Sequence, residues 1–188
     1  MGIYIVNKTI TGILLSVTLL FTQTSLANFT EELVTAALDR TNHQVQYDGS
    51  YRELKYPGGD VPENIGVCTD VVIRTYRKLG VDLQVLVHED MKSNFASYPS
   101  ARIWGLKRPD KNIDHRRVPN LQAFFMRHGV VLKVSREPSA YKAGDLVTWM
   151  LPGNLPHIGI VTHRYSESTG NPLIAVSYTH LRAHETAT

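Results

Sequence analysis

The sequence predicts one exported domain of the α+β class. Residues 1–27 have the pattern of a secretory signal, amphipathic helical periodicity is concentrated between residues 28 and 128, and β-branched runs fill the part that follows. The 161 residues after the signal are enough to bury a hydrophobic core without disulfides or metals. We therefore expect a single domain over residues 28–176, with helices first and strands after them.

The N-terminal segment has the three parts of a secretory signal. One positive charge, on Lys8, precedes an apolar run over residues 10–21, and Ser25-Leu26-Ala27 has the small residues of a cleavage site. Cleavage after Ala27 would release a periplasmic or secreted protein without a stable membrane span. An uncleaved N-terminal anchor is the alternative, although the apolar run is short for a membrane span.

Two helices are predicted in the first half of the mature chain. Residues 28–40 have apolar positions at helical spacing and two glutamates near the start. Residues 66–80 form the second helix, which ends at Gly80. Its apolar face comprises Cys68, Val71, Val72, Thr75, Tyr76 and Leu79, and its polar face comprises Arg74, Arg77 and Lys78.

Cys68, the one cysteine of the sequence, stands in the first turn of this second helix. Free N–H groups and the helix dipole at that end favour a thiolate, which is the reactive form of the side chain. Burial as an inert apolar residue is the plainer interpretation. A lone thiol in an oxidising compartment could also form an intermolecular disulfide.

The middle of the chain is less regular. Residues 81–90 fit either a strand or a short helix, residues 98–114 resemble a long surface segment beside a cleft, and residues 121–128 form a helix capped by Asn120. Before that helix, Arg116 and Arg117 either grip substrate carboxylates or belong to an exposed charge run. The candidate substrate-binding residues are Asp60, His115, Arg116 and Arg117.

Strands are predicted over residues 130–134, 146–150, 157–162 and 173–176. Period-two alternation places His157 on the face of its strand that small Gly159 leaves open. A cysteine at a helix start, followed 89 residues later by a histidine at a strand start, is the order of papain-type enzymes. In these enzymes the thiol attacks an acyl carbon, and the imidazole passes the thiol proton to the leaving amine.

Composition argues against several other classes of protein. The net charge of +3 falls to +2 without Lys8, which is too small to indicate nucleic-acid binding. His88, Glu89 and Asp90 are potential metal ligands, but consecutive residues point in different directions and no second cluster accompanies them. We therefore predict no nucleic-acid partner, no metal and no cofactor, and we expect a monomer.

Several strings place the chain near a known group of enzymes. The segments Ala143-Gly144-Asp145-Leu146-Val147 and His157-Ile158-Gly159-Ile160-Val161 resemble the central strands of NlpC/P60-type cell-wall cysteine peptidases. More specific strings resemble a branch of these exported bacterial proteins, domain-of-unknown-function family 1287: Tyr56-Pro57-Gly58-Gly59-Asp60, Gly66-Val67-Cys68-Thr69-Asp70-Val71-Val72, His88-Glu89-Asp90-Met91, and residues 112–120.

The resemblance implies a papain-like fold in which the nucleophile helix packs on a small antiparallel sheet. It makes Cys68 the nucleophile and His157 the base, and it makes peptide amide bonds of peptidoglycan the substrate. A catalytically inactive cell-wall or peptide binding module on the same fold is the alternative function.

The chain departs from the group at two places. Asp70 follows the cysteine closely, and its charge would oppose a thiolate. The third catalytic residue is expected after the strand at residues 173–176, where this branch would continue with His-Asn-Ile-Gly. The chain instead ends in Ser177-Tyr178-Thr179-His180 and eight further residues. Residues 177–188 resemble a translated sequencing-adapter fragment, so we expect them to be non-native and the domain to be truncated at its C-terminus. An ordinary divergent tail is the alternative, and His180 could then replace the third residue.

Overall fold

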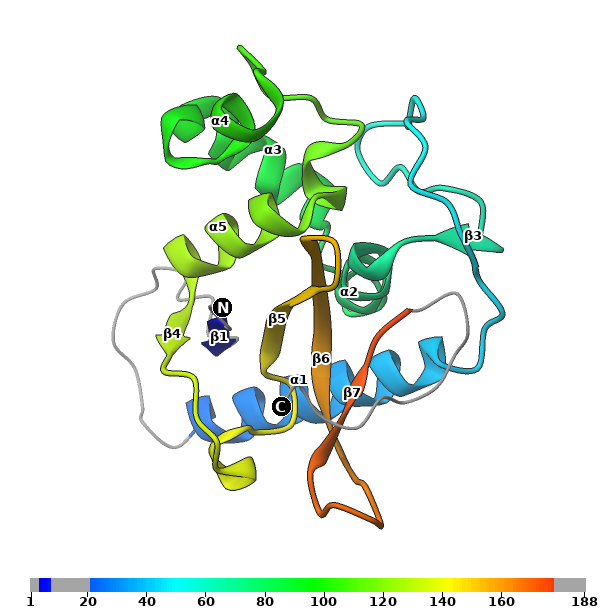
Figure 1. Ribbon diagram of the computed structural model, residues 1–188, viewed down its shortest axis with the longest axis vertical. Coiled ribbons are helices and arrows are strands. Elements are labelled where there is room, and N and C mark those ends of the chain that lie inside the picture. The colour runs from blue at the N-terminus through cyan, green and yellow to red at the C-terminus, as the bar shows by residue number, and fades with distance from the viewer. Residues whose placement is uncertain (1–3, 8–20, 178–188) are drawn as a thin grey trace.

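A computed structural model describes the backbone of residues 4–7 and 21–177, and the side chains of residues 28–177. It confirms the α+β class (Figure 1). The helices are α1 (Phe21–Arg40), α2 (Cys68–Lys78), α3 (Leu83–Asn94), α4 (Ser100–Trp104) and α5 (Val118–His128). Three short 3-10 turns are η1 (Phe95–Ser97), η2 (Asp114–Arg116) and η3 (Pro138–Ala140). The strands are β1 (Tyr4–Asn7), β2 (Gln46–Tyr47), β3 (Ile65–Gly66), β4 (Val130–Leu132), β5 (Leu146–Leu151), β6 (Leu155–Tyr165) and β7 (Pro172–Ala175).

The main sheet is antiparallel throughout, with the strand order β4-β1-β5-β6-β7. A second, two-stranded parallel pair joins β2 to β3 just before α2. The strands predicted from β-branched runs are present, and β6 extends beyond its prediction at both ends. Gly144 has a positive φ of 87° in the tight turn that leads the chain into β5.

The core lies between the sheet and the helices that pack on one of its faces, α1, α2 and α5 (Figure 1). Ile158 and Ile160 of β6 belong to this core, as the alternation along the strand predicted. Val161 points to the opposite face, where it packs with Val147 in a smaller cluster. Strand β6 therefore has buried residues on both faces.

Several details of the helices differ from the sequence prediction. The undecided segment at residues 81–90 lies largely in helix α3, which Asp82 caps by accepting a hydrogen bond from the Gln84 N–H. Helix α5 begins at Val118 with Arg117 as its N-cap, so the prediction that Asn120 caps it is wrong. The side chain of Asn120 is buried and bonds to Ser100 and Asp114 instead.

The predicted signal sequence coincides with two elements of the structure. Tyr4–Asn7 form β1, which lies between β4 and β5, and α1 runs through the expected cleavage site near Ala27. The remaining residues of this segment, 1–3 and 8–20, and the tail from residue 178 onward are outside the described residues. In the part that is described, no helix combines the length and hydrophobicity that crossing a bilayer would take.

Candidate active site

Cys68 is the first residue of α2, as the sequence predicted. The extended backbone of Val67 precedes it, and the Val67 N–H donates a 2.7 Å hydrogen bond to Oδ2 of Asp70. Gly66 fits this turn because a side chain there would meet Asp70 Oδ2 at 3.1 Å. The hydroxyl of Thr69 donates to the carbonyl of Arg116 at 2.9 Å, which ties the first turn of α2 to η2.

The thiol of Cys68 is buried, with only 5% of the residue exposed. Burial raises its pKa to about 11, although backbone N–H groups of Ile158, Thr69 and Cys68 itself lower it in part. The charge of Asp70 raises the pKa further, as the sequence indicated. The N–H groups at the helix start lower the pKa of Cys68, as the sequence indicated, but in this structure desolvation raises it by more.

His157 is the third residue of β6 and is 6% exposed. Opposite it on β5 lies Trp149, and the two rings meet edge-on with centroids 5.2 Å apart. A hydrogen bond to the backbone of Ser177 raises the pKa of His157, but burial has the larger effect and lowers it below the usual value. The imidazole is therefore neutral near pH 7, as a general base must be before it accepts a proton.

The fold brings the segments that carry Cys68 and His157 together. The backbone of Ile158, the residue directly after His157, hydrogen-bonds with the Cys68 sulfur. The side chains of Cys68 and Ile158 share the main core, whereas His157 lies on the Trp149 side of the strand. The chain that follows β7 reaches His157 at Ser177, which is where the sequence placed the third catalytic residue. His180 lies outside the described residues.

The charge of Asp70 is balanced by Arg116. The guanidinium Nε and Nη2 atoms each lie 2.9 Å from a carboxylate oxygen of Asp70, and both side chains are at least 97% buried. This is the bidentate geometry that guanidinium and carboxylate groups favour. The sequence singled out both residues but gave no signal that they pair, because 46 positions separate them.

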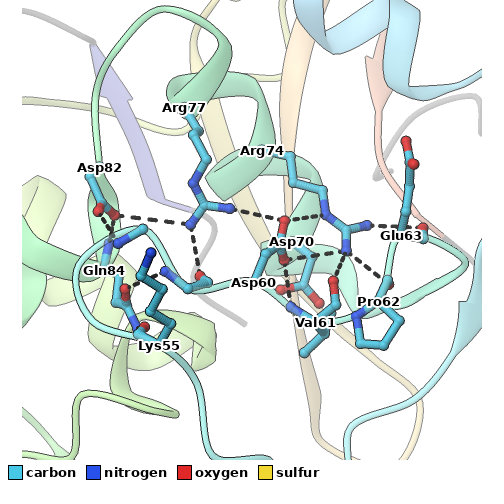
Figure 2. A network of polar contacts seen from close by, with 12 residues as sticks. Lys55, Asp60, Val61, Pro62, Glu63, Asp70, Arg74, Arg77, Asp82 and Gln84 are labelled. Carbon is cyan, nitrogen blue, oxygen red and sulfur yellow. Dashed lines mark hydrogen bonds and ion pairs between the residues drawn. The ribbon is translucent and has the colours of Figure 1, made fainter.

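The predicted substrate-binding residues have internal partners. Asp60 accepts hydrogen bonds from Arg74 and Arg77 at 2.9 Å each (Figure 2). Arg117 pairs with Asp114 and lies 4.1 Å from the centre of the Trp104 ring. His115 is buried, which lowers its pKa to about 4. The role of these residues and Arg116 toward a substrate stays a prediction.

Arg74 is the clearest departure from the predicted helix faces. We expected it on the polar face of α2, but it is only 9% exposed. Besides Asp60, its guanidinium donates to backbone carbonyls of the loop before α2, at Val61, Pro62, Glu63 and Ile65 (Figure 2). The loop before α2 surrounds the guanidinium of Arg74. The spacing of apolar residues along a helix cannot predict that such a charged side chain is buried.

Within residues 4–7 and 21–177, no group of three or more His, Cys, Asp and Glu side chains is arranged to hold a metal ion. The prediction of a metal-free, cofactor-free site is not tested by this finding.

Comparisons with known proteins give one family and one relative. The family described as "Domain of unknown function (DUF1287)" matches residues 34–187. "Uncharacterized protein YijF" of Escherichia coli (strain K12) is 51% identical over 148 residues, which cover 79% of this chain and 71% of that protein. No solved structure was found to match.

Proposed function

This chain belongs to the DUF1287 family, and from that membership we propose an exported, papain-like thiol hydrolase or acyl transferase of the NlpC/P60 type. Its substrates would be peptide amide bonds of the bacterial cell wall. The observation that carries the proposal is the packing of α2 on β6, which places Cys68 in the same core cluster as Ile158, the residue next to His157.

The chemistry uses these two side chains and a carbonyl substrate, and it requires the His157 imidazole, which lies beside Trp149, to come within reach of the Cys68 sulfur. His157 takes the thiol proton as the Cys68 sulfur attacks the amide carbon, and the same proton then passes to the leaving nitrogen as the C–N bond breaks. Water or a second amine resolves the resulting thioester, which gives hydrolysis or transfer respectively. Because both residues are at least 94% buried, the residues that cover them must move apart before a peptide reaches the sulfur.

A second function, a peptide-binding module without catalysis, is favoured by the state of the thiol. Burial raises the pKa of Cys68 to about 11, so the thiol is protonated at pH 7. A buried, protonated thiol behaves as a small apolar side chain. In that case the chain would bind cell-wall peptide and leave it intact.

Mass spectrometry of the protein incubated with muropeptides distinguishes the two functions. Catalysis predicts a covalent acyl adduct on Cys68, or cleaved product, that disappears in Cys68→Ala and His157→Gln. His163→Gln is the matched control, because His163 lies on the same strand but is exposed. Binding of muropeptide without adduct or product, together with a Cys68 that iodoacetamide alkylates no faster than a free thiol, would establish the binding module instead.

A further inference from the structure

A broad groove lies away from Cys68 and His157, neither of which lines it. Its volume is about 790 Å³, within the range typical of small-ligand sites. The long segment between α4 and η2, residues 105–112, forms most of the wall, and Tyr51 and His88 complete it. The sequence indicated a surface segment bordering a cleft in this region but assigned no ligand to it.

The groove carries three cations that the protein does not neutralise. Lys107, Arg108 and Lys111 line it and are exposed. Among the residues described, none of the three forms an ion pair; Lys111 instead lies 5.7 Å from the centre of the Tyr56 ring. Arg116, by contrast, is paired with Asp70.

The one carboxylate in the groove is already engaged. Oδ2 of Asp110 accepts a hydrogen bond from the Tyr51 hydroxyl at 3.1 Å, and Oδ1 accepts one from the Asn112 N–H at 2.9 Å. The side-chain amide of Asn112 donates to the same hydroxyl at 2.8 Å. Asp110 therefore holds the wall in shape, and with its negative charge counted the three cations still leave the lining with a net charge of +2.

Hydrogen bonds to polar side chains hold the backbone of the segment that carries the three cations. Gln84 is fully buried, and its side-chain amide donates to the carbonyl of Lys55 (Figure 2). The same amide donates to the carbonyl of Lys111 at 3.2 Å. Asn112 Oδ1 accepts from the Leu54 N–H at 3.0 Å, and Asp114 accepts from the Asp110 N–H. A wall that is already ordered lowers the entropy cost of binding a ligand.

We propose that this groove binds an acidic peptide, with Lys107, Arg108 and Lys111 contacting its carboxylates. Three charges spread along five residues of an open groove suit an extended ligand that carries several separated charges. Guanidinium groups bind carboxylates in bidentate fashion, and the 60% exposed ring of Tyr51 offers apolar contact between charges. Phosphate sites commonly use the free N–H groups in the first turn of a helix. None of the residues that line the groove lies in such a turn, which favours a peptide over a phosphate ligand.

Calorimetry with a short glutamate-rich peptide tests the proposal on residues 1–188 carrying Cys68→Ala, which lacks the proposed nucleophile. We expect the peptide to bind, and the glutamine peptide of equal length not to bind. Replacing Lys107, Arg108 and Lys111 together by Gln should weaken binding by at least about tenfold, the loss expected for one charge-assisted hydrogen bond. The affinity should also fall when salt rises from about 20 to about 200 mM.

The matched control replaces three exposed cations outside the groove, Lys133, Arg136 and Arg164, by Gln, and should bind as the parent does. Equal weakening in both triple variants would show nonspecific attraction and overturn the proposal. Absence of binding, or tighter binding of inorganic pyrophosphate than of the peptide, would overturn it as well. None of these outcomes depends on whether Cys68 is catalytic.

Discussion

His115 makes the stability of the protein sensitive to acid. It is 2% exposed in η2, and burial lowers its pKa to about 4, whereas the unfolded chain protonates near 6.5. Between these values the unfolded state binds a proton that the folded state excludes. The contribution of neutral His115 to the free energy of unfolding is therefore fully present above pH 6.5. As the pH falls toward 4 the free energy of unfolding decreases by roughly 3 kcal/mol.

Urea unfolding at several pH values measures this effect. His115→Gln should lose less stability between pH 7 and pH 4.5 than the parent, even if the variant is less stable at pH 7. His163→Gln serves as the control, because it removes an exposed histidine instead of a buried one. If the free energy of unfolding falls equally with pH in the parent and in His115→Gln, then His115 is not the acid-sensitive group.

Gly59 is required by lack of space. A Cβ at this position would meet the Lys55 carbonyl oxygen at 2.0 Å, and the Gly59 N–H donates to Gln84 in the buried network of Figure 2. We expect Gly59→Ala to destabilise the protein by about 3 kcal/mol or more, since the obstructing atoms are backbone. Gly58→Ala, where φ is 75° but no atom lies within 4 Å, should cost about 1–2 kcal/mol. Thermal unfolding of both variants checks that Gly59→Ala loses more stability than Gly58→Ala.

At the level of elements, the first turn of α2 is attached to η2 by the buried pair of Asp70 and Arg116. Arg116→Gln leaves the Asp70 carboxylate buried without its counter-ion, which should destabilise the protein by about 3–5 kcal/mol. The double variant Asp70→Asn with Arg116→Gln removes the isolated charge and should recover part of the loss. Denaturant titrations of the parent, Asp70→Asn, Arg116→Gln and the double variant form a double-mutant cycle.

The control for this cycle is Arg52→Gln, which breaks an exposed ion pair with Asp48 and should change stability little. A loss for Arg116→Gln as small as that for Arg52→Gln would show that the buried pair does not hold the two elements together.

The helices and strands illustrate which parts of the fold the sequence could predict. α2, β5 and β6 have periodic patterns strong enough to define them, and Cys68 and His157 could be located on them. The surroundings of those residues depend on distant partners. Arg74 is buried because loop carbonyls and Asp60 surround it, and the Cys68 pKa rises because the core covers it; neither effect has a local pattern.

At the scale of the whole molecule, the region around Cys68 is assembled from three separate parts of the chain. The loop before α2 is held by Arg74, η2 is held by Asp70, and β6 supplies Ile158 to the sulfur. Two of these contacts, Asp70 with Arg116 and Cys68 with Ile158, join segments whose sequence resembles the family. The same interlocking buries the thiol, so a catalytic cycle would require these contacts to open on one side.

The sheet should change when the predicted signal is removed. β1 pairs with β4 through Val6 and Val131, and with β5 through Ile5 and Val147, so cleavage after Ala27 removes the strand between them. Backbone groups of β4 and β5 that face β1 then lose their partners, whereas the β5 to β6 ladder is untouched.

Hydrogen exchange on the full-length chain and on residues 28–188 tests this expectation. Amides of Val130–Leu132 and those of Leu146–Leu151 that face β1 should exchange faster in the shorter protein, while amides of β6 should keep their protection. N-terminal sequencing of exported protein should begin at Asn28 if the signal is cleaved as predicted. Unchanged protection of β4 and β5 in the shorter protein would mean that another segment fills the place of β1, because an open ladder cannot protect its own edge amides.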